Sequence, residues 1–174
     1  MNLKTHTFVI AFAAASALSL QASIVSARDV QDQQSSASQG HARTIHGVWR
    51  TVVTPYDCQT GVPSPSLALA GLFTFNAGGT MAEYGIRPGT TPASRSPGHG
   101  VWQREHGWQD YSFVFTFYRY DASGVFLGSQ KITATLELGA GGDAFASRSA
   151  IEILDVNGAV IGTGCATAVG ARFE

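Results

Sequence analysis

The chain has 174 residues, of which 13% are charged, and its formal net charge at pH 7 is −1. It contains no run of Lys or Arg, and acidic residues slightly outnumber basic ones. The sequence therefore carries no electrostatic footprint for nucleic acid or for an anionic membrane surface, and we expect no nucleic-acid partner.

The first 27 residues have the pattern of a secretory signal peptide. Lys4 precedes an uncharged, mostly apolar run at residues 8–20, and small residues at Val25 and Ala27 precede Arg28. This pattern predicts cleavage after Ala27 and a secreted or periplasmic protein, whose net charge falls from −1 to −2 when Lys4 is removed. The apolar run at residues 8–20 is shorter than the roughly 20 residues that a spanning helix needs, so we predict no membrane span.

Residues 28–43 are rich in Gln and Ser and contain one large apolar residue, Val30. Such a segment buries too little apolar surface to offset its ordering entropy, so it is predicted to be a disordered leader. The remaining residues, 44–174, suffice for one domain with its own core.

The two cysteines, Cys58 and Cys165, are the only ones in the chain. An even pair in an oxidising compartment most often forms a disulfide. A redox-active pair is the alternative, but neither a C-x-x-C spacing nor a basic cluster beside either thiol supports it. A bridge would join the start of the domain to its end and, in the chain-entropy model, stabilise it by up to about 4–5 kcal/mol.

From Thr44 onward, period-two alternation and turn signals recur along the chain, which is typical of an all-β meander. Turns are predicted at NAGG, DASG, GAGGD and DVNG, and Pro55 belongs at a bulge or a strand end. Residues 87–99 contain three prolines and are predicted to be irregular. The predicted strands cover residues 44–58, 67–75, 80–86, 100–107, 110–120, 125–138, 144–154 and 159–173.

Eight sequential antiparallel strands form either two sheets or an up-and-down barrel, and only the barrel removes both sheet edges. In a closed meander the first strand pairs with the last, which would bring Cys58 and Cys165 together. We therefore predict an all-β, eight-stranded antiparallel up-and-down barrel closed by one disulfide.

Strand 110–120 has Tyr111, Phe113, Phe115 and Phe117 on one face, followed by Arg119. We expect the phenylalanines to point inward, although the alternation alone does not fix which face is buried. The last strand alternates small residues, which either leave room inside the barrel or let a neighbouring backbone approach closely. An eight-stranded barrel can be filled by side chains or hold one small ligand, so both possibilities stay open.

Two short motifs carry a family resemblance. The sequence GVW, Gly47 to Trp49, opens the first strand, and ARFE, Ala171 to Glu174, ends the last one. These residues resemble the G-x-W tryptophan and the packed arginine of the lipocalins and the wider calycin group. The chain lacks the T-D-Y motif and the helix before the last strand of classical lipocalins.

The resemblance implies that Trp49 and Arg172 form a structural pair at the closed end of the barrel. It also implies that a small, largely apolar molecule binds in the barrel mouth. If Cys58 and Cys165 lie opposite each other, the register places Trp49 near residue 174, so Arg172 would reach the indole ring. A cation over an indole contributes roughly 0.5–2 kcal/mol.

The leading hypothesis is an exported protein that binds a small apolar or amphipathic molecule. Arg87, Arg95 and His99 are expected at the mouth, where they could pair with a carboxylate or another polar head group. The predicted wall residues are Phe73, Phe75, Tyr84, Trp102, Tyr111, Phe113, Phe115 and Phe117.

Two other functions are compatible with the sequence. An enzyme on a similar barrel would use Glu83 or His99 for acid–base chemistry, because burial raises the pKa of a carboxyl group. A filled barrel would act only through its surface.

No metal or cofactor is predicted. His99 and His106, with Glu83 or Glu105 as a third ligand, match no familiar zinc spacing. A nucleophilic serine elbow, G-x-S-x-G, is absent from the sequence. The oligomeric state is left open.

Overall fold

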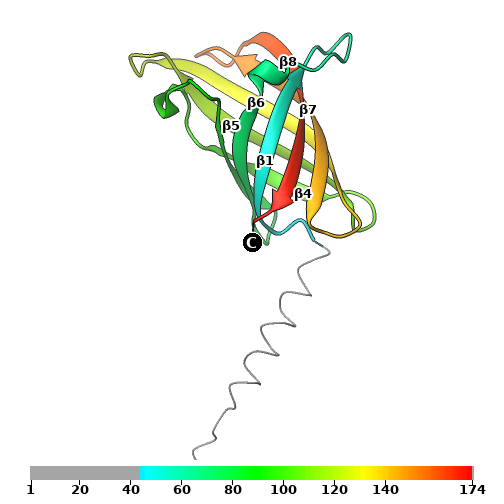
Figure 1. The fold of residues 1–174 in the computed structure, drawn as a ribbon. Coiled ribbons are helices and arrows are strands. Elements are labelled where there is room, and N and C mark those ends of the chain that lie inside the picture. Colours follow the sequence, from blue (N-terminus) through cyan, green and yellow to red (C-terminus); the bar gives the residue numbers. More distant parts are fainter. Residues whose placement is uncertain (1–43, 174) are drawn as a thin grey trace, which may run out of the picture.

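The computed structural model describes residues 44–173, which form a closed antiparallel barrel of eight strands (Figure 1). The predicted signal peptide and leader, residues 1–43, lie outside the described residues. Each strand pairs with its neighbours in sequence, and the first also pairs with the last, so the predicted up-and-down barrel is confirmed. The strands are β1 (Gly47–Tyr56), β2 (Leu69–Phe75), β3 (Thr80–Ile86), β4 (Gly98–Arg104), β5 (Asp110–Tyr120), β6 (Phe126–Leu138), β7 (Ala144–Leu154) and β8 (Val160–Arg172).

Several strand ends differ from the prediction. The 3-10 helix η1 (Pro65–Leu67) precedes β2, which begins at Leu69 instead of residue 67. The strand β4 begins at Gly98 instead of residue 100, because Gly98 and His99 pair with residues of β3. It ends at Arg104 because the Glu105 amide donates to the Asp110 carbonyl (2.8 Å), which starts the turn into β5. The prediction that residues 87–99 are irregular throughout was therefore wrong, and this connection also contains the 3-10 helix η2 (Pro92–Ser94).

The predicted disulfide joins Cys58 to Cys165, whose Cα atoms lie 5.4 Å apart. The β1–β8 register, however, places Trp49 opposite Arg172 instead of residue 174. The two-residue offset arises because β1 ends at Tyr56 and Cys58 lies in the following turn. The Asp57 carboxylate fixes that turn by accepting hydrogen bonds from the amides of Gln59 (2.9 Å) and Thr60 (2.7 Å).

Trp49 and Arg172 meet at the end of the barrel where the described chain begins and ends, the lower end in Figure 1. Trp49 is fully buried and its Nε1 donates to the Ile45 carbonyl (2.9 Å). The Arg172 guanidinium carbon lies 4.3 Å from the centre of the indole ring, and its nitrogens donate to the carbonyls of Thr44 and His46, each at 2.7 Å. One arginine therefore ties the first described residues across this end of the barrel, which we call the closed end.

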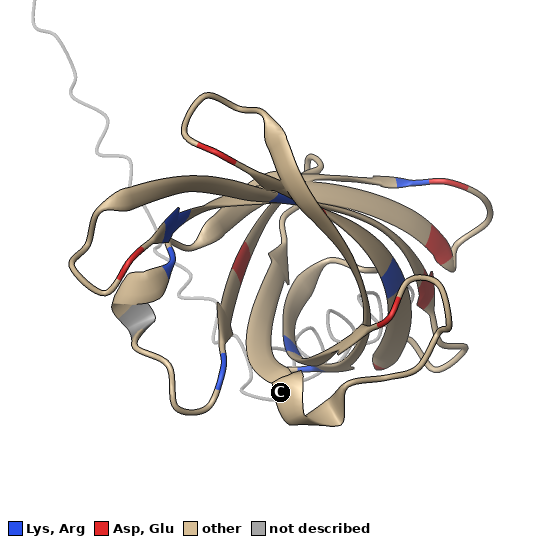
Figure 2. Cartoon of the chain, turned by 90° about the horizontal axis from the view of Figure 1, so that it is seen from above, with Lys and Arg blue, Asp and Glu red and all other residues tan. Residues whose placement is uncertain are grey.

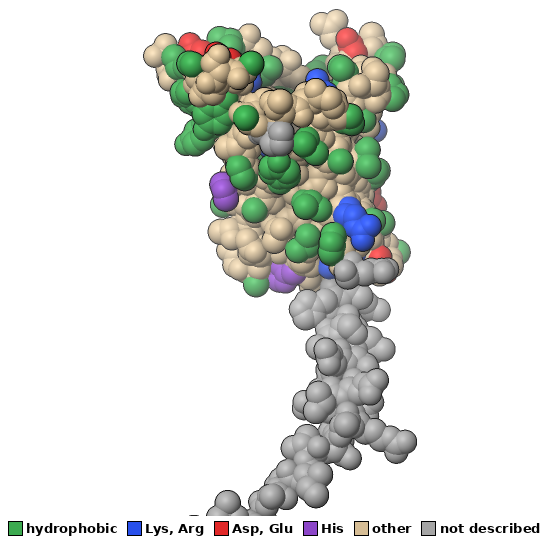
Figure 3. All heavy atoms as spheres, turned by 60° about the vertical axis from the view of Figure 1, so that its left-hand side comes forward, with side chains coloured by type: hydrophobic (Ala, Val, Ile, Leu, Met, Phe, Trp, Pro, Cys, Tyr) green, Lys and Arg blue, Asp and Glu red, His purple; other side chains and the backbone are tan. Residues whose placement is uncertain are grey.

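The inward face of β5 is the phenylalanine face, as predicted, with Phe113, Phe115 and Phe117 all buried. Phe73 of β2 packs edge-on against Phe113, with ring centres 5.8 Å apart. The outer face carries scattered apolar side chains among polar ones (Figure 3). No helix within the described part of the chain has the length and apolar character needed to cross a membrane.

Candidate functional site

The interior opposite the closed end contains a cavity of about 490 Å³. Figure 2 looks along the barrel and shows the strands arranged around its axis, with basic and acidic residues scattered over strands and loops. The apolar part of the wall comes from every strand except β4 and includes Val53, Leu69, Phe73, Ile86, Phe113, Phe115, Phe117, Ile132, Ile151, Ile153, Ala166 and Ala168. The barrel is therefore hollow at one end and filled with aromatic side chains at the other.

Small residues on β8 make room for this cavity. Gly164, Ala166 and Ala168 line it, and Ala166 is only 1% exposed. Nearer the closed end, Gly170 serves a different purpose, because a Cβ atom there would lie 2.2 Å from the ring of Phe145. The same alternation of small residues thus gives space at one end and close packing at the other.

A buried ion pair lies in the cavity wall. Glu83 of β3 points inward and is 3% exposed, and its carboxylate pairs with the guanidinium of Arg95. The same guanidinium stacks over Phe117, 3.5 Å from the ring centre. Glycines make room for the pair, because a Cβ atom at Gly85 or Gly98 would lie within 3 Å of a Glu83 carboxylate oxygen.

Burial raises the pKa of Glu83, because the loss of water around the carboxylate outweighs the attraction of Arg95. A carboxyl group with a raised pKa in an apolar cavity can hold a proton closer to neutral pH than an exposed one. It can therefore donate a hydrogen bond or transfer a proton to a bound molecule.

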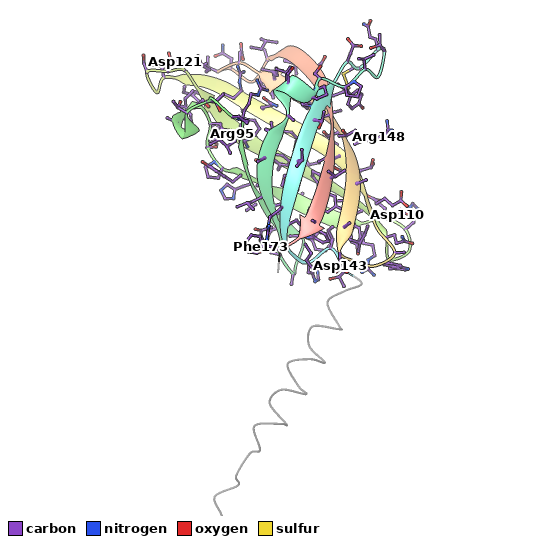
Figure 4. The ribbon with its side chains drawn as sticks, viewed as in Figure 1. Arg95, Asp110, Asp121, Asp143, Arg148 and Phe173 are labelled. Carbon is purple, nitrogen blue, oxygen red and sulfur yellow. A yellow bond between two sulfur atoms is a disulfide. The ribbon has the colours of Figure 1, made fainter. Side chains whose placement is uncertain are left out.

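The connection between β3 and β4 completes the cavity wall at the end of the barrel opposite the closed end. Ser96 fixes it to β5, since its amide donates to the Tyr118 carbonyl and its hydroxyl accepts from the Tyr118 amide, both at 2.9 Å. Thr90, Thr91 and Ser94 of this connection also line the cavity. Figure 4 shows Arg95 at this upper end of the barrel, beside the connection that carries it.

Arg119 is a cavity residue that the sequence interpretation did not assign to the site. It continues the inward face of β5 beyond Phe117, so the period-two alternation was the signal that could have found it. Its Nη1 atom is buried and has no hydrogen-bond partner among the described residues. In the next residue pair the β5–β6 register shifts, which marks a β-bulge at the end of the inward face.

The predicted binding residues fall into three places. Phe73, Phe113, Phe115, Phe117, Arg87 and Arg95 line the cavity. Phe75, Trp102 and Tyr111 pack together toward the closed end, where the Trp102 and Tyr111 ring centres are 5.8 Å apart. Tyr84 and His99 are exposed on the outer surface, so the structure does not bring them together with the cavity residues.

The ionisable residues considered as metal ligands are also separated. Glu83 is inside the barrel, whereas His99, Glu105 and His106 are exposed. Among residues 44–173, no group of three or more His, Cys, Asp or Glu side chains could hold a metal ion.

Comparison of the sequence with known proteins found no matching family model and no similar curated protein. The closed eight-stranded up-and-down barrel is consistent with a calycin-like fold, but a fold alone does not define a function, which resides in the cavity and its residues.

Proposed function

We propose that this protein binds a small apolar or amphipathic molecule inside the barrel. The observation that supports this proposal is the cavity of about 490 Å³ with its mostly apolar wall. Its volume lies within the range of roughly 300–1,000 Å³ that is common for small-molecule sites. At roughly 30 Å³ for each non-hydrogen atom, it accommodates a molecule of about 16 such atoms.

The distribution of polar groups also supports an amphipathic ligand. Phenylalanine and aliphatic side chains make up most of the wall, with Glu83 buried among them, whereas Arg95 and the hydroxyl groups of the β3–β4 connection lie at the open end. A ligand with an apolar body and one polar end fits this arrangement, because each part meets groups of its own kind. In this proposal the Trp49–Arg172 pair stabilises the closed end and does not touch the ligand, as in the lipocalins that the chain resembles.

Titration with N-phenyl-1-naphthylamine, a neutral apolar dye that fluoresces in apolar surroundings, tests the proposal. We expect saturable binding with one site per chain and displacement of the dye by decan-1-ol. Native mass spectrometry of the purified protein mixed with the dye should also show one bound dye molecule per chain. Absence of saturable binding by both methods would contradict the proposal.

An acid–base enzyme is the second candidate, and it is favoured by the burial of Glu83 in the cavity wall, which raises the pKa of its carboxyl group. The ion pair with Arg95 counts against it, because it holds the carboxylate in a fixed contact. If Glu83 transfers protons, Glu83→Gln should abolish turnover of a bound molecule while binding is retained. If Glu83 only shapes the wall, no reaction of the bound molecule depends on it.

We also propose that the protein is exported. The Cys58–Cys165 disulfide supports an oxidising compartment, where such bonds form and persist. The intact mass of the protein recovered outside the cytoplasm should match a chain that begins at Arg28. An uncleaved chain that stays in the cytoplasm would contradict export.

A further inference from the structure

We infer that the molecule held in the cavity carries an acid group and that Arg119 binds that group. This inference rests on the proposed binding function and specifies the chemical class of the ligand. It is drawn from the charges that line the cavity, from the unpartnered nitrogen of Arg119 and from the local shape of β5.

The charges that line the cavity do not balance. Three arginines, Arg87, Arg95 and Arg119, face a single carboxylate, that of Glu83. Arg95 takes this carboxylate in its ion pair, and Arg87 is exposed to solvent. Arg119 is therefore the cavity arginine that has neither an acidic partner within the described residues nor full access to water.

A buried guanidinium nitrogen without a partner is costly, because it has lost its water and gained no hydrogen bond in return. The Nη1 atom of Arg119 is in this position. Arg119 lines the cavity, so a carboxylate bound there would pair with its charge, and a small rotation of the guanidinium would bring Nη1 to one carboxylate oxygen, since the fork matches both oxygens. The feature that is unfavourable in the empty barrel is thus favourable once an acid is bound.

The backbone around Arg119 supports a role in binding. The register of the β5–β6 pair shifts immediately after Arg119, and Gly128, its partner on β6, has a positive φ of 109°. A Cβ atom at Gly128 would lie 2.2 Å from the Leu154 carbonyl oxygen, so the bulge depends on glycine. Bulges of this kind re-aim side chains next to functional sites.

The aromatic rings fix the orientation of the ligand. Phe117 precedes Arg119 by one inward position, and Phe115 and Phe113 continue the same face deeper into the barrel. An acid group at Arg119 therefore places the apolar body of the ligand along these three rings. The proposed ligand class is a carboxylic acid with a compact or single-chain apolar part of up to about 13 carbon atoms, given the cavity volume of about 490 Å³.

Isothermal titration of the folded, oxidised protein near neutral pH tests this inference with decanoate, decan-1-ol and decyltrimethylammonium. These probes share one apolar chain and differ in head-group charge. We expect decanoate to bind roughly 10- to 100-fold more tightly than decan-1-ol, and the cation to bind most weakly, as one charge-assisted contact predicts.

Three variants identify the residue responsible. Arg119→Gln should remove most of the preference for decanoate while decan-1-ol still binds, and Arg119→Lys should keep part of it. Arg148→Gln is the matched control, because it removes the same charge from an exposed site on β7, across the barrel from Arg95 in Figure 4. The control should keep the full preference.

The outcomes separate this inference from the proposed function. If decan-1-ol binds the unaltered protein as tightly as decanoate, or if Arg119→Gln keeps the preference, the acid-binding role is overturned while the binding function stands. If no probe binds, both are overturned. Thermal melting adds a check, because the melting temperature of ligand-free Arg119→Gln should be equal or higher. A clear decrease would count against the inference, since it would mean that the guanidinium stabilises the empty barrel.

Discussion

Arg172 shows how one side chain can close an end of a barrel. Its guanidinium covers Trp49 and donates to the carbonyls of Thr44, His46 and Gly142. Arg172→Ala removes these contacts and leaves three partly buried carbonyls without their donor. We expect the free energy of unfolding in urea to fall by about 2–3 kcal/mol.

Arg50→Ala provides the control for this prediction. Arg50 also lies over an aromatic ring, at 4.8 Å from the centre of Phe173, but both residues are exposed. Its replacement should change the free energy of unfolding by no more than about 0.5 kcal/mol. Equal effects of the two substitutions would mean that Arg172 does not hold the closed end.

The ion pair of Glu83 and Arg95 leads to a prediction about pH. Because the pKa of Glu83 in the folded protein is raised above its usual value of 4.5, the folded state binds a proton more tightly than the unfolded state. The stabilisation that comes from Glu83 is therefore fully present below pH 4.5 and is lost as the pH rises through the raised pKa.

Urea unfolding of the unaltered protein and of Glu83→Gln at several pH values measures this effect. The stability of the unaltered protein relative to the variant should decrease as the pH rises from acidic to neutral. A relative stability that increases with pH would show that Arg95 lowers the pKa of Glu83 and that the pair outweighs the desolvation.

The single residues of the site differ in how far the sequence reveals them. The inward phenylalanines follow from the alternation of β5, and Arg95 was expected at the mouth from its place in a proline-rich connection. Arg119 lies on the same predicted face. The sequence does not show that its Nη1 atom lacks a hydrogen-bond partner, because this depends on how β4, β5 and the β3–β4 connection pack together. His99 is predicted at the rim but lies exposed on β4. The sequence does not reveal this position, because the start of β4 depends on pairing with β3 and not on local sequence.

Among the elements of the barrel, β8 most directly controls the cavity. Ala166→Leu would add three carbon atoms to the cavity wall, where Ala166 is buried. We expect stability to be unchanged or increased, since the added atoms fill space, and dye or decan-1-ol binding to be weakened or lost. The measurement is the dye titration combined with thermal melting.

Val169→Leu is the control on the same strand, because Val169 points outward and is exposed. It should leave ligand binding unaltered. If Ala166→Leu binds the dye as well as Val169→Leu does, the dye site lies elsewhere.

The strands themselves illustrate which features are local. Alternation and turn residues predict all eight strands, because each depends on a short stretch of sequence. Their ends and register depend on partners: β1 stops before Cys58 because the Asp57 turn begins, and this moves Arg172 opposite Trp49. The predicted contact between Trp49 and Arg172 nevertheless forms, because an offset of two keeps both side chains on the same face.

In the barrel as a whole, the disulfide and the β1–β8 ladder close the same sheet. The bond links residues 107 apart in sequence, so it restricts the unfolded chain strongly. Replacing both cysteines with serine should lower the free energy of unfolding by about 2–5 kcal/mol while the far-ultraviolet circular dichroism spectrum is retained. A reducing agent should destabilise the unaltered protein and not the variant. If the variant is as stable as the unaltered, oxidised protein, the disulfide does not stabilise the barrel.

The barrel is hollow at one end, and we propose that it holds its ligand there. Methyl nuclear magnetic resonance during a titration with decan-1-ol can locate the bound molecule, because Ile132, Ile151 and Ala166 report on the interior and Val52, Ile161 and Val169 on the outer surface. We predict saturable shifts of the interior methyl groups with the outer ones unchanged. Shifts confined to the outer methyl groups, or none in either set, would contradict a ligand-binding interior.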